Sequence, residues 1–353
     1  MSQLTTHNVR IAGIGACVPR NVEENLELSI FVNEEEARKV IDSTGIERHR
    51  RVDEGVTASD LSIKAIERLV ADLGWDIKSV DLLLYVCTTR DYIQPMTSPI
   101  IQNKLGMRQD SYVMDLPLGC SGWVYGMSVA SSLMCQGSLK RGLLVASETN
   151  TRSHNMHDRT SRPLFGDAAT VTALEYDKDN ACPINYVFGV DGAGANAIMA
   201  QYGGMRYPVT PECLHEVETE PGVWRKGTDV VINGMDVFSF AIRRPVKQMK
   251  EFIDKFNIDI DNVDYLFLHQ ANLYIDERIR KSLSFPDFKT PYCLADFGNV
   301  SGASIPLTMV TKVSKPLSEK KCHNLACGFG VGLSWASMEF WTSNLVISDI
   351  VEY

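Results

Sequence analysis

Apolar and polar positions follow the same order in two distant stretches of the chain. Residues 65–86 read as an amphipathic helix, a short polar turn and an apolar strand, and residues 246–269 repeat this order. Both strands begin at a Val-Asp pair, at 80–81 and at 263–264. The strands are runs of Leu, Val, Phe and Tyr, a composition typical of parallel strands buried on both faces. The pattern therefore predicts one parallel central strand in each half of the chain.

Two further pairs of segments support an internal duplication. Cys-Ser-Gly at 120–122 is similar to Val-Ser-Gly at 300–302, and the glycine turn and strand at 165–176 are similar to those at 329–340. All three pairs occur in the same order. Chance matches within an ordinary α/β protein are the alternative, but they explain the shared order poorly.

The predicted fold class is α/β, with two pseudo-equivalent halves at residues 1–176 and 227–353. Each half should contribute one sheet, and the two sheets should pack against a shared layer of helices, because each has apolar faces to bury. Residues 177–226 contain adjacent glycines, several prolines and acidic residues, so we interpret them as a connecting excursion between the halves.

Composition restricts the classes of function. The 353 residues are 44% hydrophobic and 22% charged, which suits one large or two ordinary domains. The net charge of −9 disfavours nucleic acid as a partner, because phosphate binding depends on clustered Lys and Arg. Nine cysteines without a CxxC pair indicate neither a disulfide framework nor a zinc module. We expect a cytoplasmic protein, since neither a leader pattern nor a membrane-spanning apolar run is present.

Cys120 is the candidate nucleophile. It follows a strand-like run at 112–118 and precedes small and apolar residues at helical spacing, so it should lie at a strand-to-helix turn. A helix N-terminus lowers the pKa of a thiol and favours the reactive thiolate. Gly119 and Gly122 should let another molecule approach closely. The alternative is a buried structural cysteine, which the glycine frame disfavours.

His269 and Asn299 are the candidate partners of Cys120. His269 ends the second apolar strand, at the sheet edge where α/β proteins place their sites. Asn299 precedes Val300, the residue that corresponds to Cys120 in the repeat, so pseudo-symmetry should make it face the thiol. A core histidine and a helix N-cap are the respective alternatives. The glycine-rich stretch 326–337 should supply backbone N–H groups that form an oxyanion hole with that of Cys120.

Two other groups of residues carry weaker signals. His154 and His157 stand beside Asp158, but no third ligand has a recognisable spacing, so we expect no metal. Basic side chains recur along helical segments in an otherwise acidic chain. Solvated helix faces explain them, and docking of an acidic carrier protein is the second interpretation. These basic residues are Arg243, Arg244, Lys247, Lys250, Arg278, Arg280 and Lys281.

Over nearly its whole length the sequence resembles the ketoacyl synthase III branch of the thiolase-like condensing enzymes. The motifs that carry the resemblance are GCSG around Cys120, HQAN at 269–272, GN-x-S-x-ASIP at 298–306, LFGD at 164–167 and GFG-x-G at 328–332. The resemblance implies a thiolase fold, with two duplicated βαβαβαββ halves forming a five-layered αβαβα core, and a homodimer. It also implies a triad of Cys120, His269 and Asn299.

The reaction implied by the resemblance is a decarboxylative Claisen condensation. An acyl group passes from a thioester to Cys120, and malonyl-acyl carrier protein loses carbon dioxide to give the carbanion that attacks it. His269 and Asn299 would stabilise the enolate oxygen, and the N–H groups of Cys120 and Val331 the tetrahedral oxyanion. No cofactor or metal is implied, and coenzyme A or phosphopantetheine thioesters are the substrates.

Departures from the family pattern predict a specialised relative. Lys39 stands where the family usually has a tryptophan that stacks on adenine, although its partner arginine is retained as Arg159. Tyr274 and Ser239 replace basic residues near the carrier entrance. With Asn272 of HQAN, these are the candidate substrate-binding residues. Residues 90–99 are expected to shape the acyl pocket across the dimer.

Two other functions remain open at this stage. Acyl transfer from Cys120 to an alcohol or amine would need His269 alone as a base, so the presence of Asn299 favours condensation. A catalytically silent partner subunit is the third interpretation, but such subunits often lose the cysteine or the histidine, and this chain retains both.

Overall fold

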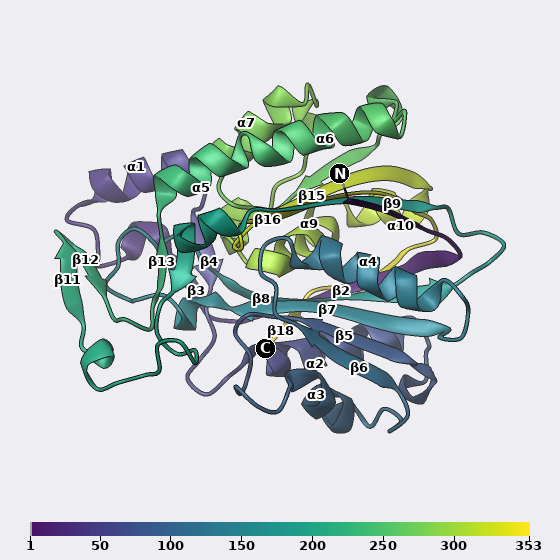
Figure 1. Ribbon diagram of the computed structural model, residues 1–353, viewed down its shortest axis with the longest axis horizontal. Coiled ribbons are helices and arrows are strands. Elements are labelled where there is room, and N and C mark those ends of the chain that lie inside the picture. The colour runs from purple at the N-terminus through teal and green to yellow at the C-terminus, as the bar shows by residue number, and fades with distance from the viewer. Residues whose placement is uncertain (1) are drawn as a thin grey trace.

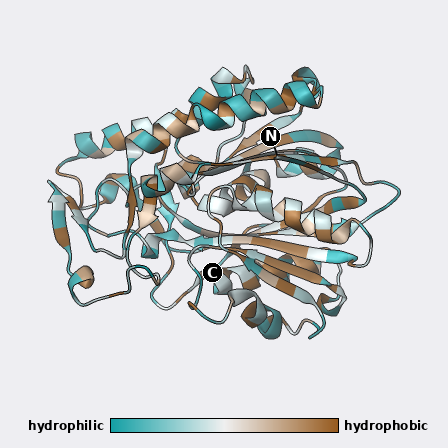
Figure 2. Cartoon of the chain, in the orientation of Figure 1, coloured by the Kyte–Doolittle hydropathy of each residue, from teal (hydrophilic) through white to brown (hydrophobic). Residues whose placement is uncertain are grey.

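The computed structural model describes residues 2–353 and has the predicted α/β class (Figure 1). Two mixed β-sheets enclose a central layer of helices, and other helices cover the outer face of each sheet, which gives five layers. In Figure 2 the apolar colour concentrates on the strands, whereas the outer helices carry both hydrophilic and apolar colours. Within these residues, no helix has both the length and the apolar character needed to cross a membrane.

The first sheet has seven strands in the order β17-β2-β8-β7-β5-β6, with β18 also paired to β2. Antiparallel pairing joins β2, β8 and β7, and parallel pairing joins β7, β5 and β6. Its strands are β2 (Val9–Val18), β5 (Leu82–Val86), β6 (Tyr112–Leu116), β7 (Arg141–Thr149), β8 (Asp167–Tyr176), β17 (Val346–Ile347) and β18 (Val351–Glu352).

The second sheet has five strands in the order β1-β9-β16-β15-β14. The pairing is antiparallel from β1 to β15, and parallel between β15 and β14. Its strands are β1 (Ser2–Thr6), β9 (Ile184–Val190), β14 (Tyr265–Leu268), β15 (Cys322–Gly330) and β16 (Ser334–Thr342).

The two sheets have the same internal order. Strands β2-β8-β7-β5 correspond to β9-β16-β15-β14 in both neighbours and relative direction. The aspartates of the two Val-Asp pairs also make equivalent hydrogen bonds. The Asp81 carboxylate accepts a hydrogen bond from the backbone N–H of Lys140 at 2.7 Å, and that of Asp264 accepts one from His323 at 2.9 Å. Each aspartate thereby ties its strand to the start of the neighbouring parallel strand. Strand β5 lies inside its sheet as predicted, but β14 is an edge strand, so the prediction of a central strand is wrong for the second half.

Three apolar clusters hold the layers together. The central cluster joins α4 (Gly122–Met134) and α9 (Ser304–Lys312) to the inner faces of both sheets. On the first sheet, α2 (Ala58–Asp72) and α3 (Thr97–Leu105) cover the outer face. On the second sheet, α5 (Gly234–Ala241), α6 (Arg244–Lys255) and α7 (Leu273–Ser282) do so. Strand residues therefore alternate between two clusters, which explains their continuous apolar runs.

The remaining elements surround this core. Helix α1 (Glu34–Thr44) contacts α7, and α8 (Leu294–Phe297) and α10 (Ser314–Glu319) flank α9. Three two-stranded ribbons pair β3 (Val22–Glu24) with β4 (Arg48–Arg50), β10 (Ile198–Ala200) with β13 (Val230–Ile232), and β11 (Val217–Glu220) with β12 (Val223–Arg225).

The predicted division of the chain is wrong in three places. Strand β1 of the first half lies in the second sheet, β17 and β18 of the second half lie in the first sheet, and β9 does not belong to the excursion. We assigned residues 177–226 to a connecting excursion, but residues 184–190 form β9 and pair with both β16 and β1 in the second sheet. The ribbon of β11 and β12 lies within the predicted excursion, whereas β13, the partner of β10, lies beyond the predicted end at residue 226. The glycines and prolines that suggested an excursion lie mainly beyond residue 200. The sequence analysis included the short apolar run of β9 in the same segment.

Candidate active site

Cys120 lies between β6 and α4, at the predicted strand-to-helix turn. The neighbouring glycines have a different role from the one we expected. A Cβ on Gly122 would lie 2.3 Å from Val86 Cγ1, and one on Gly119 would lie 3.0 Å from Val331 Cγ1. These glycines therefore admit the chain's own side chains, and they let α4 pack between the two sheets.

The surroundings of Cys120 disfavour the thiolate in the resting protein. Burial raises the pKa of the Cys120 thiol, although hydrogen bonds from the Val331 backbone and the Ser301 side chain oppose the rise. The net direction is opposite to the one that the helix N-terminus alone predicts, because desolvation penalises the charged form more strongly. Nucleophilic attack therefore requires a base or a bound substrate to take up the thiol proton.

His269 follows β14, and its side chain is only 1% exposed. Its Nδ1 lies 2.9 Å from the hydroxyl of Ser304, and its ring meets Phe329 edge-on at 5.4 Å between centroids. Burial lowers the pKa of His269 to about 4, against a smaller opposing effect of the Ser301 backbone. The imidazole is therefore neutral near pH 7 and has one N–H donor and one acceptor nitrogen.

Asn299 is held by backbone and side-chain contacts at the edge of the same region. Its backbone forms a parallel bridge with Phe165, and its side-chain Oδ1 accepts a hydrogen bond from the N–H of Ser301 at 2.9 Å. This use of Oδ1 is turn-forming, but Asn299 is not the helix N-cap of the alternative interpretation, because Val300 and Ala303 are the N-cap residues of the helices that follow. Because the oxygen is occupied, the Nδ2 group is the part of the side chain that remains to act as a donor.

Ser301 joins the three candidate residues, and the sequence analysis did not select it. Its hydroxyl lies 4.0 Å from Cys120 Sγ, its N–H donates to Asn299, and its backbone favours the protonated form of His269. It also has a φ of +52°, a conformation that is uncommon for a residue other than glycine. A signal was available, because Ser301 is the serine of the repeated Ser-Gly pair.

The glycine-rich end of β15 and the turn that follows it close over the nucleophile. A Cβ on Gly330 would lie 2.5 Å from Cys120 Sγ, and one on Gly328 would lie 3.0 Å from the Cys120 carbonyl oxygen. The backbone N–H of the next residue, Val331, hydrogen-bonds to the Cys120 sulfur. The Val331 N–H thus lies beside the nucleophile, where the predicted oxyanion hole requires a donor.

The sequence analysis also did not select Glu148, a buried glutamate near the end of β7. It accepts hydrogen bonds from the N–H and hydroxyl groups of Thr88 and Thr89, at 2.7 to 3.0 Å. Burial raises the pKa of Glu148, and the charge of this carboxyl contributes to the raised pKa of Cys120. Its position at a strand end beside the Cys120 turn was the available signal.

The two predicted adenine-binding positions do not form a stacking pair. Arg159 makes an ion pair with Glu36 of α1 at 2.9 Å, and Lys39 makes one with Glu35 at 2.7 Å. The Lys39 side chain is 71% exposed. Both candidate residues are therefore paired with glutamates of α1, and Lys39 also lies on the solvent face of that helix.

The three other candidate substrate-binding residues lie at or near the start of α7 and in α5. Asn272 caps α7, accepting a hydrogen bond from Ile275 N–H at 2.9 Å. Tyr274 is half exposed and stacks on Phe238 of α5 at 5.5 Å. Ser239 is a partly buried residue of α5. Asn272 thus has a structural task, and none of the three supplies a positive charge.

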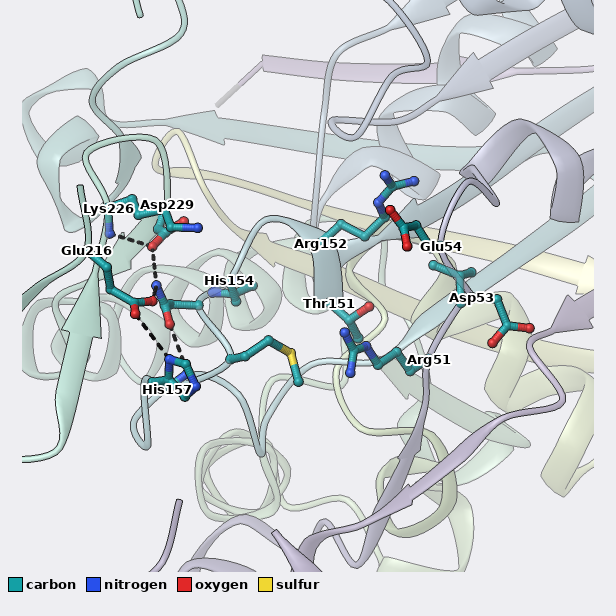
Figure 3. A pocket seen from close by; sticks show the side chains of 13 residues that line it. Arg51, Asp53, Glu54, Thr151, Arg152, His154, His157, Glu216, Lys226 and Asp229 are labelled. Carbon is teal, nitrogen blue, oxygen red and sulfur yellow. Dashed lines mark hydrogen bonds and ion pairs between the residues drawn. The ribbon is translucent and has the colours of Figure 1, made fainter. Parts of the chain in front are cut away.

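A polar cavity of about 530 Å³ lies away from Cys120, between residues 51–54, the segment after β7 and the excursion (Figure 3). His154 and His157 line it but serve different contacts. His154 is buried and stacks on Phe165 at 4.1 Å, and His157 Nδ1 lies 3.2 Å from Glu216. Among residues 2–353, no three His, Cys, Asp or Glu side chains are arranged to hold a metal ion.

Asp276, in the first turns of α7, gives a prediction about stability. Its carboxyl is fully buried and neither oxygen has a hydrogen-bond partner among the described residues. Burial raises the pKa of Asp276 well above its ordinary value. The folded protein therefore keeps a proton that the unfolded chain releases above a pKa of about 4, and stability falls as pH rises.

We expect Asp276→Asn to remove this penalty. Its advantage in unfolding free energy should grow by up to about 1.4 kcal/mol per pH unit above pH 5, until the folded-state pKa is reached. Urea denaturation at several pH values would measure it. The control is Asp349→Asn, at a side chain that is 91% exposed. A difference that does not depend on pH would contradict a neutral Asp276.

Comparison with known proteins agrees with the geometry. Residues 114–192 and 253–340 match the family models of 3-oxoacyl-[acyl-carrier-protein (ACP)] synthase III and of its C-terminal part. A β-ketoacyl-[acyl-carrier-protein] synthase III of Roseiflexus castenholzii is 32% identical over 93% of this chain and 96% of its own length. One of Clostridium perfringens is 30% identical over 94% and 98%.

A solved structure shows the same fold. The crystal structure of a 3-oxoacyl-(acyl-carrier protein) synthase from Burkholderia xenovorans superposes with a TM-score of 0.91 at 31% identity, covering 100% of this chain and 99% of the other. The thiolase-like fold and the acyltransferase class expected from the sequence are thereby confirmed. With full-length relatives above 30% identity and the same duplicated sheets, this chain belongs to the 3-oxoacyl-[acyl-carrier-protein] synthase III family.

Proposed function

We propose that this enzyme condenses an acyl thioester with malonyl-acyl carrier protein, with Cys120 as the acyl carrier. The observation that carries the proposal is the set of contacts made by Ser301. This one residue links the thiol of Cys120 to two potential donors, His269 and Asn299. A nucleophile beside two neutral donors suits a reaction that must stabilise an enolate after the acyl group is loaded.

In the loading step, Cys120 Sγ attacks the thioester carbonyl, and the thiol proton leaves with the departing thiol. The N–H groups of Cys120 and Val331 hold the tetrahedral oxyanion. In the second step, the bond between the malonyl carboxylate and its α-carbon breaks, and carbon dioxide departs. The electron pair moves to the thioester oxygen, which His269 and Asn299 stabilise by hydrogen bonding. The resulting carbon nucleophile attacks the acyl group, the C–S bond to Cys120 breaks, and the departing thiolate takes up a proton from water to restore the thiol.

A neutral histidine is compatible with this assignment, and Asn299 favours it over simple acyl transfer. Burial lowers the pKa of His269 to about 4, so the imidazole can donate a hydrogen bond without first being protonated. Transfer to an alcohol or amine would need a base and no amide donor, and Asn299 would then have no task in the chemistry. The sequences named β-ketoacyl-[acyl-carrier-protein] synthase III support the same choice.

The donor thioester is proposed to be recognised without an adenine stack. Glu36 occupies Arg159, and two further glutamates stand in the first turn of α1. Glu34 and Glu35 are paired with Arg38 and Lys39, but the pairing of Glu36 with Arg159 leaves this guanidinium less available to the phosphates of coenzyme A. A carrier-protein thioester is therefore the better candidate donor. The exposed basic side chains of α6, of which Lys250 has no ion-pair partner among the described residues, would suit an acidic carrier.

A homodimer and a cytoplasmic location are parts of the same proposal. Strand β6 is the free edge of the first sheet, and Tyr112 on it is 45% exposed. An unpaired edge of this kind invites pairing with a second copy. Tyr92, Ile93 and Met96 in the predicted pocket-shaping segment are also exposed, and a second copy would cover such side chains.

A two-stage experiment tests the function. The protein is loaded with a panel of acyl thioesters and the adduct on Cys120 is measured by intact mass; malonyl-carrier is then added. We expect a 3-oxoacyl carrier and carbon dioxide to form, and the adduct to disappear. His269→Ala and Asn299→Ala should still load but should release little carbon dioxide. An adduct that survives malonyl-carrier but transfers to an alcohol or amine would overturn condensation.

A further inference from the structure

Ser304 lies behind His269 at the seam between the two halves. It is the first residue of α9 and is 1% exposed. Its Oγ lies 2.9 Å from His269 Nδ1 and 3.3 Å from the backbone nitrogen of Gln270. Two consecutive residues that follow β14 are thus tied to one hydroxyl on the central helix.

The hydrogen-bonding capacities of these groups decide which atom carries each proton. The Gln270 N–H can only donate, so the Ser304 oxygen accepts from it. The hydroxyl has a single proton of its own to place. Among the described residues, its only potential acceptor within hydrogen-bond distance is His269 Nδ1. If the serine donates there, Nδ1 is unprotonated, and the proton of the neutral imidazole must be on Nε2.

The opposite arrangement leaves a group unsatisfied. With the proton on Nδ1, Ser304 would accept two N–H bonds and its own buried hydroxyl proton would have no acceptor. An unsatisfied buried donor costs about 1–3 kcal/mol, which is enough to shift the tautomer equilibrium strongly. The Ser301 backbone also faces the ring, and it favours a proton on the imidazole without selecting between the two nitrogens.

The geometry points to Ser304 as a positioning residue that fixes the Nε2–H tautomer of His269. This inference rests on the proposed function, since it explains how His269 presents an N–H to the enolate oxygen. Ser304 itself need not touch the substrate. Its hydroxyl hydrogen-bonds to the His269 ring and fixes the orientation of the ring. The same oxygen accepts a hydrogen bond from the backbone N–H of Gln270, the residue after His269.

The tautomer can be measured without any turnover. Protein labelled with ¹⁵N-histidine is examined by long-range ¹H–¹⁵N correlation near pH 7, with His269→Gln identifying the signals. We expect Nε2 of His269 to have the protonated, pyrrole-type shift and Nδ1 the unprotonated, pyridine-type shift. The reverse assignment would overturn the inference. This readout judges Ser304 even if malonyl-carrier is not the substrate, so the two proposals can fail separately.

Variants add a functional readout. We expect Ser304→Ala to lower malonyl-carrier decarboxylation by about tenfold to a hundredfold, while loading of Cys120 is little changed. Ser304→Thr keeps the hydroxyl and should recover much of the rate and the Nε2–H signature. The control is Ser131→Ala, which removes another fully buried hydroxyl, bonded to Tyr186 at 3.0 Å. Equal decarboxylation by the Ala and wild-type proteins would count against the role.

Discussion

Cys120→Ala is expected to form no acyl adduct and to lose condensation by at least about 10³-fold, because no other group can carry the acyl chain. The fold should survive, since the thiol makes one contact of 4.0 Å with the Ser301 hydroxyl and one hydrogen bond with the Val331 backbone. Intact mass after incubation with an acyl thioester, together with product formation from malonyl-carrier, would measure both losses.

Substitution of a different cysteine provides the control for this expectation. Cys135 and Cys182 are also partly exposed, whereas the six other cysteines besides Cys120 are buried. Cys182→Ala should therefore load normally. Iodoacetamide labelling and peptide mapping would show whether Cys120 is the reactive residue. An adduct that moves to another cysteine in the Ala variant would contradict Cys120 as the unique acyl carrier. An unreactive Cys120 in the wild type would favour the silent-subunit interpretation.

Gly330→Ala is expected to have the second largest effect, because the new methyl group would occupy the space of the nucleophile. Its Cβ would lie 2.5 Å from Cys120 Sγ and 2.6 Å from Cys120 Cβ. Relief requires the turn or the thiol to move. We expect a loss of about 1–3 kcal/mol in stability and at least about a hundredfold slower loading, since misplacement by about 1 Å is costly in catalysis.

A matched glycine separates crowding at the thiol from a general effect of the substitution. No atom lies within 4 Å of a Cβ built on Gly204, in the excursion. Gly204→Ala should therefore load Cys120 and unfold like the wild type. Thermal unfolding and adduct formation would be compared for the two variants. Normal loading by Gly330→Ala would mean that the turn does not constrain the thiol as described.

The sequence predicted the fold class and the duplication because both depend on local patterns. Residues 65–86 and 246–269 show helix and strand periodicity directly, and α2–β5 and α6–β14 follow it closely. Strand β9 was missed because its short run lies among turn-forming residues. A pattern that spans only a few residues is outweighed by neighbouring glycine and proline.

The candidate site could be predicted only in part. Cys120, His269 and Asn299 were selected from their positions at element ends and from the family resemblance, and their assigned roles stay predictions. The contacts of Ser301 and Ser304 with these residues could not be predicted. They depend on the direction of the backbone and on distances between atoms, which a sequence does not contain. The pKa of Cys120 also required coordinates, since the effect of burial exceeds that of the helix end.

The seam between the halves has a consequence for folding. The contact of Cys120 with Ser301 spans 181 residues, and the hydrogen bond of Ser121 with Ser334 spans 213. Contacts of such length form only after large chain loops have closed, which slows folding. A nascent first half would carry its cysteine without the turn that crowds it or the donors that face it. We therefore expect Cys120 to react with thioesters only when synthesis of the chain is almost complete. Measured activity would then indicate that the fold is complete.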